Sequence, residues 1–159
     1  MRTVIAKDGT KIAFDQVGSG PTVILVAGAI QHRAFDQETG YLANLLAPHF
    51  NVINYDRRGR GESGDTLPYA PAREIEDIEA LIDDEGGAAY LYGMSSGAAL
   101  AMGAAVALGS KVKKLAMYEA PYNDDPQARQ RWREYRRELE ALLTAGRRGD
   151  AMALFMRLV

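Results

Sequence analysis

The sequence contains no cysteine in its 159 residues. Disulfide bonds, thiolate metal centres and a cysteine nucleophile are therefore excluded, and a reducing compartment is compatible with the chain. Histidine is almost absent as well, because His32 and His49 are the only two. Both lie in the first third of the chain, so a chemistry that needs a histidine late in the sequence has none here.

Long hydrophobic runs are missing too. The first residues, MRTVIAKDGTK, carry charges where a signal peptide needs an apolar core. The longest apolar runs, Pro21–Ile30 and Gly97–Leu108, are too short to span a bilayer.

An excess of one charge sign is also absent, since the chain has 19 Lys and Arg and 21 Asp and Glu, which give a net charge of −2. That balance predicts no general attraction to nucleic acid or to an anionic membrane. We therefore expect a cytoplasmic protein with neither partner.

The overall composition, with 47% hydrophobic and 25% charged residues, indicates a soluble globular chain that is able to bury a core. Alternating residues in Arg2–Ala6 and Lys11–Gln16 flank the turn dipeptide Asp8-Gly9 and predict an antiparallel hairpin. The continuous apolar run Thr22–Ala27 is typical of a strand buried on both faces. Such strands need helices on both sides of their sheet, so we predict an α/β fold with a mostly parallel sheet.

Apolar spacing predicts two helices and a strand in the next part of the chain. A helix over Gln37–Leu46 precedes a strand over Asn51–Asp56. We expect the buried face of this helix to consist of Tyr41, Leu42, Leu45 and Leu46. A second helix over Ala72–Glu85 is amphipathic. Its apolar side holds Ile75, Ile78, Leu81 and Ile82, and its carboxylates are expected on the opposite side.

Three elements are predicted for the last part of the chain. Lys114–Tyr118 is interpreted as another buried strand. Asp125 is a suitable N-cap with Pro126 at the first helical position, so a polar, arginine-rich helix is expected to begin there. A final apolar helix is expected over Ala151–Val159.

The region Ala88–Leu108 combines a short apolar strand, a tight turn and a helix that is apolar on almost every face. The turn matches the G-x-S-x-G pattern of a nucleophile elbow, in the stretch Gly93-Met94-Ser95-Ser96-Gly97. Such a serine occupies a strained backbone conformation that lifts its hydroxyl above the sheet, and glycines two positions away avoid collisions there. The helix N-terminus then directs free N–H groups toward developing negative charge. The pattern therefore indicates Ser95 as a nucleophile.

A second segment follows an earlier strand and has the sequence Asp56-Arg57-Arg58-Gly59-Arg60-Gly61-Glu62-Ser63. This segment and the elbow together resemble the α/β-hydrolase superfamily, which has a D-x-R-G-x-G-x-S segment at this place, and the resemblance covers about residues 1–122. Within that superfamily the chain is similar to small esterases and to cofactor-free haloperoxidases or perhydrolases. The resemblance implies an α/β-hydrolase fold, serine hydrolase chemistry on a small ester or related acyl substrate, and no cofactor.

The resemblance also implies where the oxyanion hole lies. One backbone N–H comes from the residue after the nucleophile, which is Ser96 here. The other comes from the loop after the central strand, where the family usually has His-Gly-x and this chain has Ala27-Gly28-Ala29. Ala29 would then donate, and because the donor is a backbone group, the missing histidine does not abolish the hole.

The same resemblance places the remaining catalytic groups in the order serine, acid, histidine, with the last two downstream of the nucleophile. No histidine follows Ser95 in this chain. His32 falls near the oxyanion loop, where we interpret it as a loop residue or a substrate contact, and His49 is interpreted as a surface or capping residue. Glu119 lies where some members keep their acid, but we interpret it as a structural or supporting group.

The number of predicted strands also indicates that part of the family's fold is missing from this chain. The family adds two strands after those predicted here, and without them Lys114–Tyr118 would be an exposed apolar edge. We therefore expect residues 1–122 to be the N-terminal part of a hydrolase core and residues 123–159 to begin a helical lid or cap. The remaining strands, the acid and the histidine would be missing, cleaved or carried on another chain, which would then be a partner. The alternative is a non-catalytic half-domain or decayed enzyme that serves as a binding or assembly module.

Three weaker patterns have simpler interpretations. The stretch Gly59–Gly64 matches G-x-G-x-x-G but does not lead directly into a helix, so a glycine-rich turn held by Asp56 and Arg57 is favoured over dinucleotide binding. Acidic clusters at 83–85 and 123–125 lie at helix ends without histidine, so we expect no metal site. The arginines of residues 129–148 are interleaved with glutamates, which indicates a solvated, salt-bridged helix face rather than nucleic-acid binding.

Overall fold

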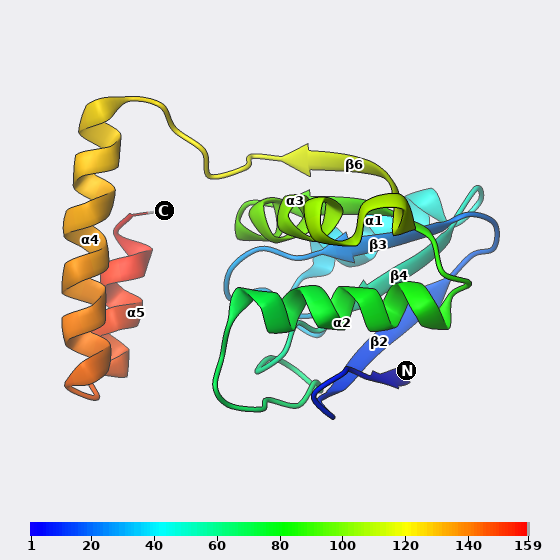
Figure 1. Cartoon of the computed structure of the whole chain (residues 1–159), viewed down its shortest axis with the longest axis horizontal. Coiled ribbons are helices and arrows are strands. Elements are labelled where there is room, and N and C mark those ends of the chain that lie inside the picture. The colour runs from blue at the N-terminus through cyan, green and yellow to red at the C-terminus, as the bar shows by residue number, and fades with distance from the viewer. Residues whose placement is uncertain (159) are drawn as a thin grey trace. The chain divides into compact units, whose positions relative to one another are not determined.

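The computed structural model describes residues 1–158 and contains a six-stranded sheet with helices packed on it (Figure 1). Its strands are β1 (Arg2–Ile5), β2 (Lys11–Val17), β3 (Thr22–Val26), β4 (Asn51–Tyr55), β5 (Ala89–Met94) and β6 (Val112–Tyr118). Their order across the sheet is β1-β2-β4-β3-β5-β6. β1 and β2 form the expected antiparallel hairpin, β2 joins β4 antiparallel, and β4, β3, β5 and β6 run parallel. The predicted α/β fold with a mostly parallel sheet is confirmed.

Helices cover both faces of this sheet. On one face, α2 (Pro71–Asp84) and α3 (Ser96–Leu108) contribute Ile78 and Ala101 to a cluster that includes Ile24 of β3. On the other face, α1 (Gln37–Leu46) contributes Ala43 to a cluster that includes Leu25 of β3. Every side chain of β3 is buried, which confirms the prediction of a central strand covered on both sides. A short 3-10 helix, η1 (Gly109–Lys111), leads from α3 into β6.

The face of α1 that meets the sheet differs from the prediction. Tyr41 and Leu45 are 67% and 56% exposed, whereas Ala43 is buried. Leu42 and Leu46 pack partly against the same cluster as Ala43. Leu42 and Leu46 lie on the predicted face and also on the face that is observed to meet the sheet. Apolar spacing alone therefore does not determine how the helix is rotated about its own axis. The small Ala43 side chain faces the sheet and allows a close approach.

The strand β6 is the last one of the sheet within the described residues, and it pairs only with β5. Its side chains at Val112 and Leu115 pack against the core, while Met117 and Tyr118 are 46% and 53% exposed. The prediction of a buried strand is therefore wrong for most of its length. The strand is instead the exposed apolar edge that the low number of strands implies.

Contacts within the chain divide it into two compact units, of which the first ends at Pro121 and the second begins at Tyr122. In the second unit, Asp125 caps α4 (Pro126–Thr144) by accepting hydrogen bonds from two N–H groups of its first turn, as predicted. Arg136 and Glu140 lie 3.5 Å apart on this helix with both side chains exposed. That pair belongs to the solvated, salt-bridged face that the interleaved charges predict.

The last helix, α5 (Arg148–Met156), begins three residues before the predicted Ala151. The predicted end, Val159, lies outside the described residues. Among residues 1–158, no helix is both long and apolar enough to cross a bilayer.

Candidate active site

Ser95 follows β5 directly and stands at the N-cap position of α3. Its backbone has φ 52° and ψ −122°, a conformation that L-residues rarely adopt. The backbone N–H donates to the carbonyl oxygen of Tyr118 at 2.9 Å, which fixes the turn against β6. The side chain is half-buried, and within residues 1–158 its hydroxyl makes no capping hydrogen bond to the helix.

The two glycines around this serine have no room for a side chain. A Cβ on Gly93 would lie 2.6 Å from the Cα of Ala98, and a Cβ on Gly97 would lie 2.1 Å from the carbonyl oxygen of Val26. Real Cβ atoms essentially never approach other atoms that closely. The turn from strand to helix therefore requires glycine at both positions, as the elbow pattern predicts.

Backbone strain is concentrated at one edge of the sheet. Among the described residues, three non-glycine residues have a positive φ, namely Ile30 at 55°, Ser95 at 52° and Glu119 at 49°. They lie in the segments that follow the carboxyl ends of β3, β5 and β6. Carboxyl ends of parallel strands share one edge, which is where α/β folds bind their ligands. Strain of this kind costs about 1–3 kcal/mol per residue and clusters at functional sites.

The loop after β3 lies against the elbow. A Cβ on Gly28 would lie 3.5 Å from the Cβ of Ser95. The N–H of Ala29, the next residue, donates to no backbone acceptor within residues 1–158. The N–H of Ser96 belongs to the first residue of α3 and so has no intrahelical acceptor. The structure thus brings the predicted oxyanion loop beside the serine and leaves both predicted N–H groups without a backbone acceptor.

Side-chain hydrogen bonds, among them those of Gln31 and Arg57, hold this loop in place. The Oε1 atom of Gln31 accepts a hydrogen bond from the N–H of Gly28 at 2.6 Å. Arg57 Nη1 donates to the carbonyl oxygen of Ala27 at 3.1 Å and to the hydroxyl of Ser96 at 3.2 Å. Arg57 therefore ties the loop after β3 to the first turn of α3.

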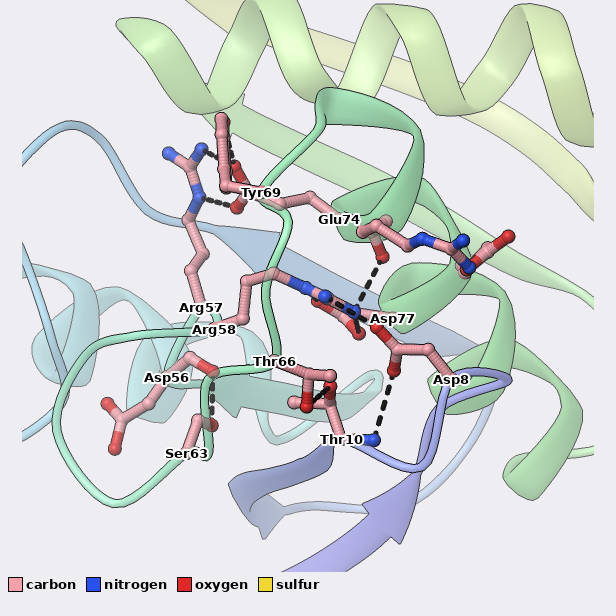
Figure 2. A network of polar contacts seen from close by, with 12 residues as sticks. Asp8, Thr10, Asp56, Arg57, Arg58, Ser63, Thr66, Tyr69, Glu74 and Asp77 are labelled. Atoms are coloured by element: carbon pink, nitrogen blue, oxygen red, sulfur yellow. Dashed lines mark hydrogen bonds and ion pairs between the residues drawn. The ribbon is translucent and has the colours of Figure 1, made fainter.

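The same arginine makes a buried ion pair with α2 (Figure 2). Its Nε and Nη2 atoms donate to the two carboxylate oxygens of Glu74 at 2.6 and 2.7 Å, and the Tyr69 hydroxyl donates to Glu74 at 2.8 Å. Burial by itself raises the pKa of Glu74, but the hydrogen bonds and charge of Arg57 outweigh it and hold that pKa below its usual value.

Arg58 makes a second buried pair beside the first (Figure 2). It donates to both oxygens of Asp77 at 2.7 and 2.8 Å, and its Nη1 reaches Asp8 in the hairpin turn at 2.8 Å. The expectation that the carboxylates of α2 lie opposite its apolar side is therefore wrong for Glu74 and Asp77, which are buried. The signal for these pairs in the sequence is two consecutive arginines directly after a buried strand, since buried guanidinium groups need carboxylate partners.

The glycine-rich stretch after β4 is a turn, as interpreted from the sequence. The carboxylate of Asp56 accepts hydrogen bonds from the N–H groups of Glu62 at 2.9 Å and Arg33 at 2.8 Å. A Cβ on Gly61 would lie 2.3 Å from Asp56 Oδ2, which explains the glycine. The next helix, α2, begins only at Pro71, so this stretch does not open a helix in the manner of a dinucleotide-binding loop.

The candidate base and acid residues are less well placed than the serine. His32 lies in the loop after β3, stacks on Phe35 with 6.1 Å between ring centroids, and has a buried Nδ1 without a partner among residues 1–158. His49 is exposed and precedes β4, at the opposite edge of the sheet from Ser95. Glu119 is exposed at the carboxyl end of β6. Within the described residues, no histidine is hydrogen-bonded to Ser95 and no serine–histidine–acid triad is assembled.

Comparison with known proteins identifies the family to which this chain belongs. A family model described as "Alpha/beta hydrolase family" matches residues 23–158. The chain therefore belongs to the α/β-hydrolase family.

Two solved hydrolase structures agree with this assignment, and a further relative is named an oxidoreductase. An α/β hydrolase from Sphaerobacter thermophilus is 52% identical with a TM-score of 0.81, over 98% of this chain and 59% of that one. An esterase from Exiguobacterium antarcticum is 28% identical with a TM-score of 0.65, over 72% of this chain and 43% of that one. The probable oxidoreductase EphD of Mycobacterium tuberculosis is 36% identical over 89 residues, which are 52% of this chain and 14% of that protein. The chain thus spans less than two thirds of the length of each of these relatives.

Proposed function

We propose that this chain supplies the nucleophile and the oxyanion hole of a serine hydrolase that cleaves a small ester or a related acyl substrate. The Ser95 hydroxyl attacks the acyl carbon and its proton passes to a base. The N–H groups of Ala29 and Ser96 stabilise the oxyanion, and the alcohol leaves with the proton. Water then hydrolyses the acyl-enzyme by the same route. A serine at this position argues against the carboxylate attack used by epoxide hydrolases.

The proposal rests above all on the backbone of Ser95. Its strained conformation places a hydroxyl that does not cap the helix at the N-terminus of α3, between two glycines where a Cβ would collide with backbone atoms. A turn with a purely structural role gains nothing from a strained serine, because glycine adopts a positive φ at lower cost.

The base is proposed to come from outside residues 1–159. In this proposal, the histidine and its acid are carried by a continuation of the chain or by a second polypeptide. The greater length of the S. thermophilus hydrolase and the exposed edge of β6 support this view.

A non-catalytic binding or assembly module is the second candidate. The observation that favours it is the lack of a histidine bonded to Ser95 within residues 1–158. The two candidates differ in one property, which is the reactivity of the Ser95 hydroxyl toward an electrophile.

A fluorophosphonate probe tests that property on the full chain expressed from its own gene, with its natural partner if it has one. We expect covalent labelling of the wild type and loss of labelling in Ser95→Ala. Ser110→Ala, which removes an exposed hydroxyl next to β6, is the matched control and should label like the wild type. An intact, folded protein that the probe leaves unmodified would end the hydrolase proposal in favour of the binding module.

A further inference from the structure

Arg60 differs from the other arginines near the elbow because it has no carboxylate partner within residues 1–158. Arg33, Arg57 and Arg58 each form ion pairs with one or more carboxylates. Arg60 is half-buried, and its Nη1 donates only to the carbonyl oxygen of Gly28 at 2.8 Å. Its Nε and Nη2 atoms are accessible to solvent. A guanidinium has five donor hydrogens, so most of those on Arg60 remain free to bind a ligand.

The positive charge of Arg60 has no direct carboxylate partner within residues 1–158. Burial, and then the neighbouring guanidinium of Arg57, lower the pKa of Arg60, while Glu74 raises it. An arginine side chain nevertheless stays protonated in proteins. Glu74 already uses both oxygens on Arg57. Arg57 and Arg60 therefore both lie near Glu74, whose carboxylate is bound by Arg57 and not by Arg60.

The unpaired charge of Arg60 lies one residue away from the candidate nucleophile. The residue that accepts the hydrogen bond of Arg60, Gly28, is also the residue whose Cβ position lies 3.5 Å from the Cβ of Ser95. Only one residue separates the guanidinium from the serine, which limits their separation to on the order of 10 Å. A short acyl chain that ends in a carboxylate fits such a span.

We propose that Arg60 binds a carboxylate on the acyl part of the substrate, so that the preferred substrates are half-esters of short dicarboxylic acids. The inference rests on the proposed function, because it assigns a substrate class to the same site. Arginine suits this role because its planar donors bind a carboxylate through two parallel hydrogen bonds. Arg60 is then a specificity-determining residue that contacts the substrate away from the reacting bond.

A purely structural role for Arg60 makes a different prediction. If its hydrogen bond to Gly28 only shaped the oxyanion loop, substitution would lower kcat for charged and neutral esters alike. Recognition of a carboxylate instead raises KM for the charged ester more than for the neutral ester, in addition to any change in kcat that the two esters share.

The test compares 4-nitrophenyl hydrogen glutarate with 4-nitrophenyl pentanoate, which has the same acyl length without the charge. Both are hydrolysed by the full chain expressed from its own gene, as wild type, Arg60→Gln, Arg60→Lys and Arg73→Gln. Arg73 is a half-buried arginine paired with Glu76 on α2 and gives a matched loss of charge. We expect Arg60→Gln to raise KM for the glutarate ester about 10-fold or more, the range expected for a lost hydrogen bond to a charged group. Arg60→Lys should recover part of the preference, and Arg73→Gln should leave both esters unaffected.

Two results would overturn the inference while the proposed function stands. One is a wild type that hydrolyses the pentanoate ester but does not prefer the glutarate ester. The other is a preference that survives in a folded Arg60→Gln protein. If neither ester is hydrolysed, the proposed function fails on these substrates, and calorimetric titration with glutarate decides the inference separately. Weaker binding of glutarate in Arg60→Gln than in Arg73→Gln supports carboxylate recognition, and absent or equal binding overturns it.

Discussion

Gly97 shows how a single residue decides the geometry of the elbow. Its missing side chain lets the first turn of α3 approach the end of β3, because a Cβ there would lie 2.1 Å from the carbonyl oxygen of Val26. We expect Gly97→Ala to lower the free energy of unfolding by about 2 kcal/mol or more, as overpacking against rigid backbone does. Urea denaturation followed by circular dichroism measures this change.

Gly40 provides the control for the Gly97→Ala substitution. It lies inside α1, and a Cβ added there would have no atom within 4 Å. Gly40→Ala should raise the free energy of unfolding by about 0.5–1 kcal/mol, because alanine loses less backbone entropy in a helix. Equal effects of the two substitutions would show that the close contact at Gly97 is relieved by a shift of the chain.

At the scale of elements, α2 is attached to the loop after β4 by the pair of Glu74 with Arg57. Removing one partner of a buried ion pair leaves the other charge uncompensated. We expect Glu74→Gln to lower the free energy of unfolding by about 3 kcal/mol at pH 7. Glu76→Gln, which breaks the more exposed pair with Arg73 on the same helix, should cost no more than about 1 kcal/mol.

The contribution of Glu74 should also depend on pH. Its pKa in the folded chain lies below the usual value because Arg57 outweighs the effect of burial. A carboxylate of this kind stabilises the fold fully above its unfolded pKa of about 4.3, and the stabilisation is lost as the pH falls through the lower folded pKa. The difference between wild type and Glu74→Gln in urea titrations should therefore shrink as the pH is lowered from 6 toward 3. A difference that stays constant over this range would contradict the role given to the Glu74 charge.

At the scale of the whole molecule, the edge strand β6 determines how the chain behaves in solution. Its outer backbone groups are unpaired within residues 1–158, and Met117 on it is 46% exposed. Exposed apolar edge strands pair with other chains. We expect the 159-residue chain to self-associate with increasing concentration in sedimentation velocity experiments.

A charge on this edge should weaken that association. Met117→Lys places a lysine where natural edge strands carry them, and should shift the distribution toward the monomer. Leu45→Lys introduces the same charge at an exposed position on α1, away from the edge, and should leave the distribution unchanged. Equal effects of both variants would attribute the association to general hydrophobicity rather than to β6.

The sequence by itself determined the elbow, the central strand and the parallel sheet. These features follow from local sterics and from apolar patterning, which residues close in sequence encode. The two glycines around Ser95 and the continuous apolar run of β3 are examples, since each allows only one local conformation or environment. The lack of a histidine after Ser95 is likewise a property of the sequence alone.

Only the tertiary structure decided which charges are buried and which partner each one has. Glu74 and Asp77 lie on a helix whose spacing suggested exposed carboxylates, yet they are buried against arginines that lie 17 and 19 positions earlier in the chain. The rotation of α1 and the lack of a carboxylate partner for Arg60 within residues 1–158 were decided in the same way. Pairing between distant segments depends on where the backbone brings them, and no periodicity within a segment encodes that arrangement.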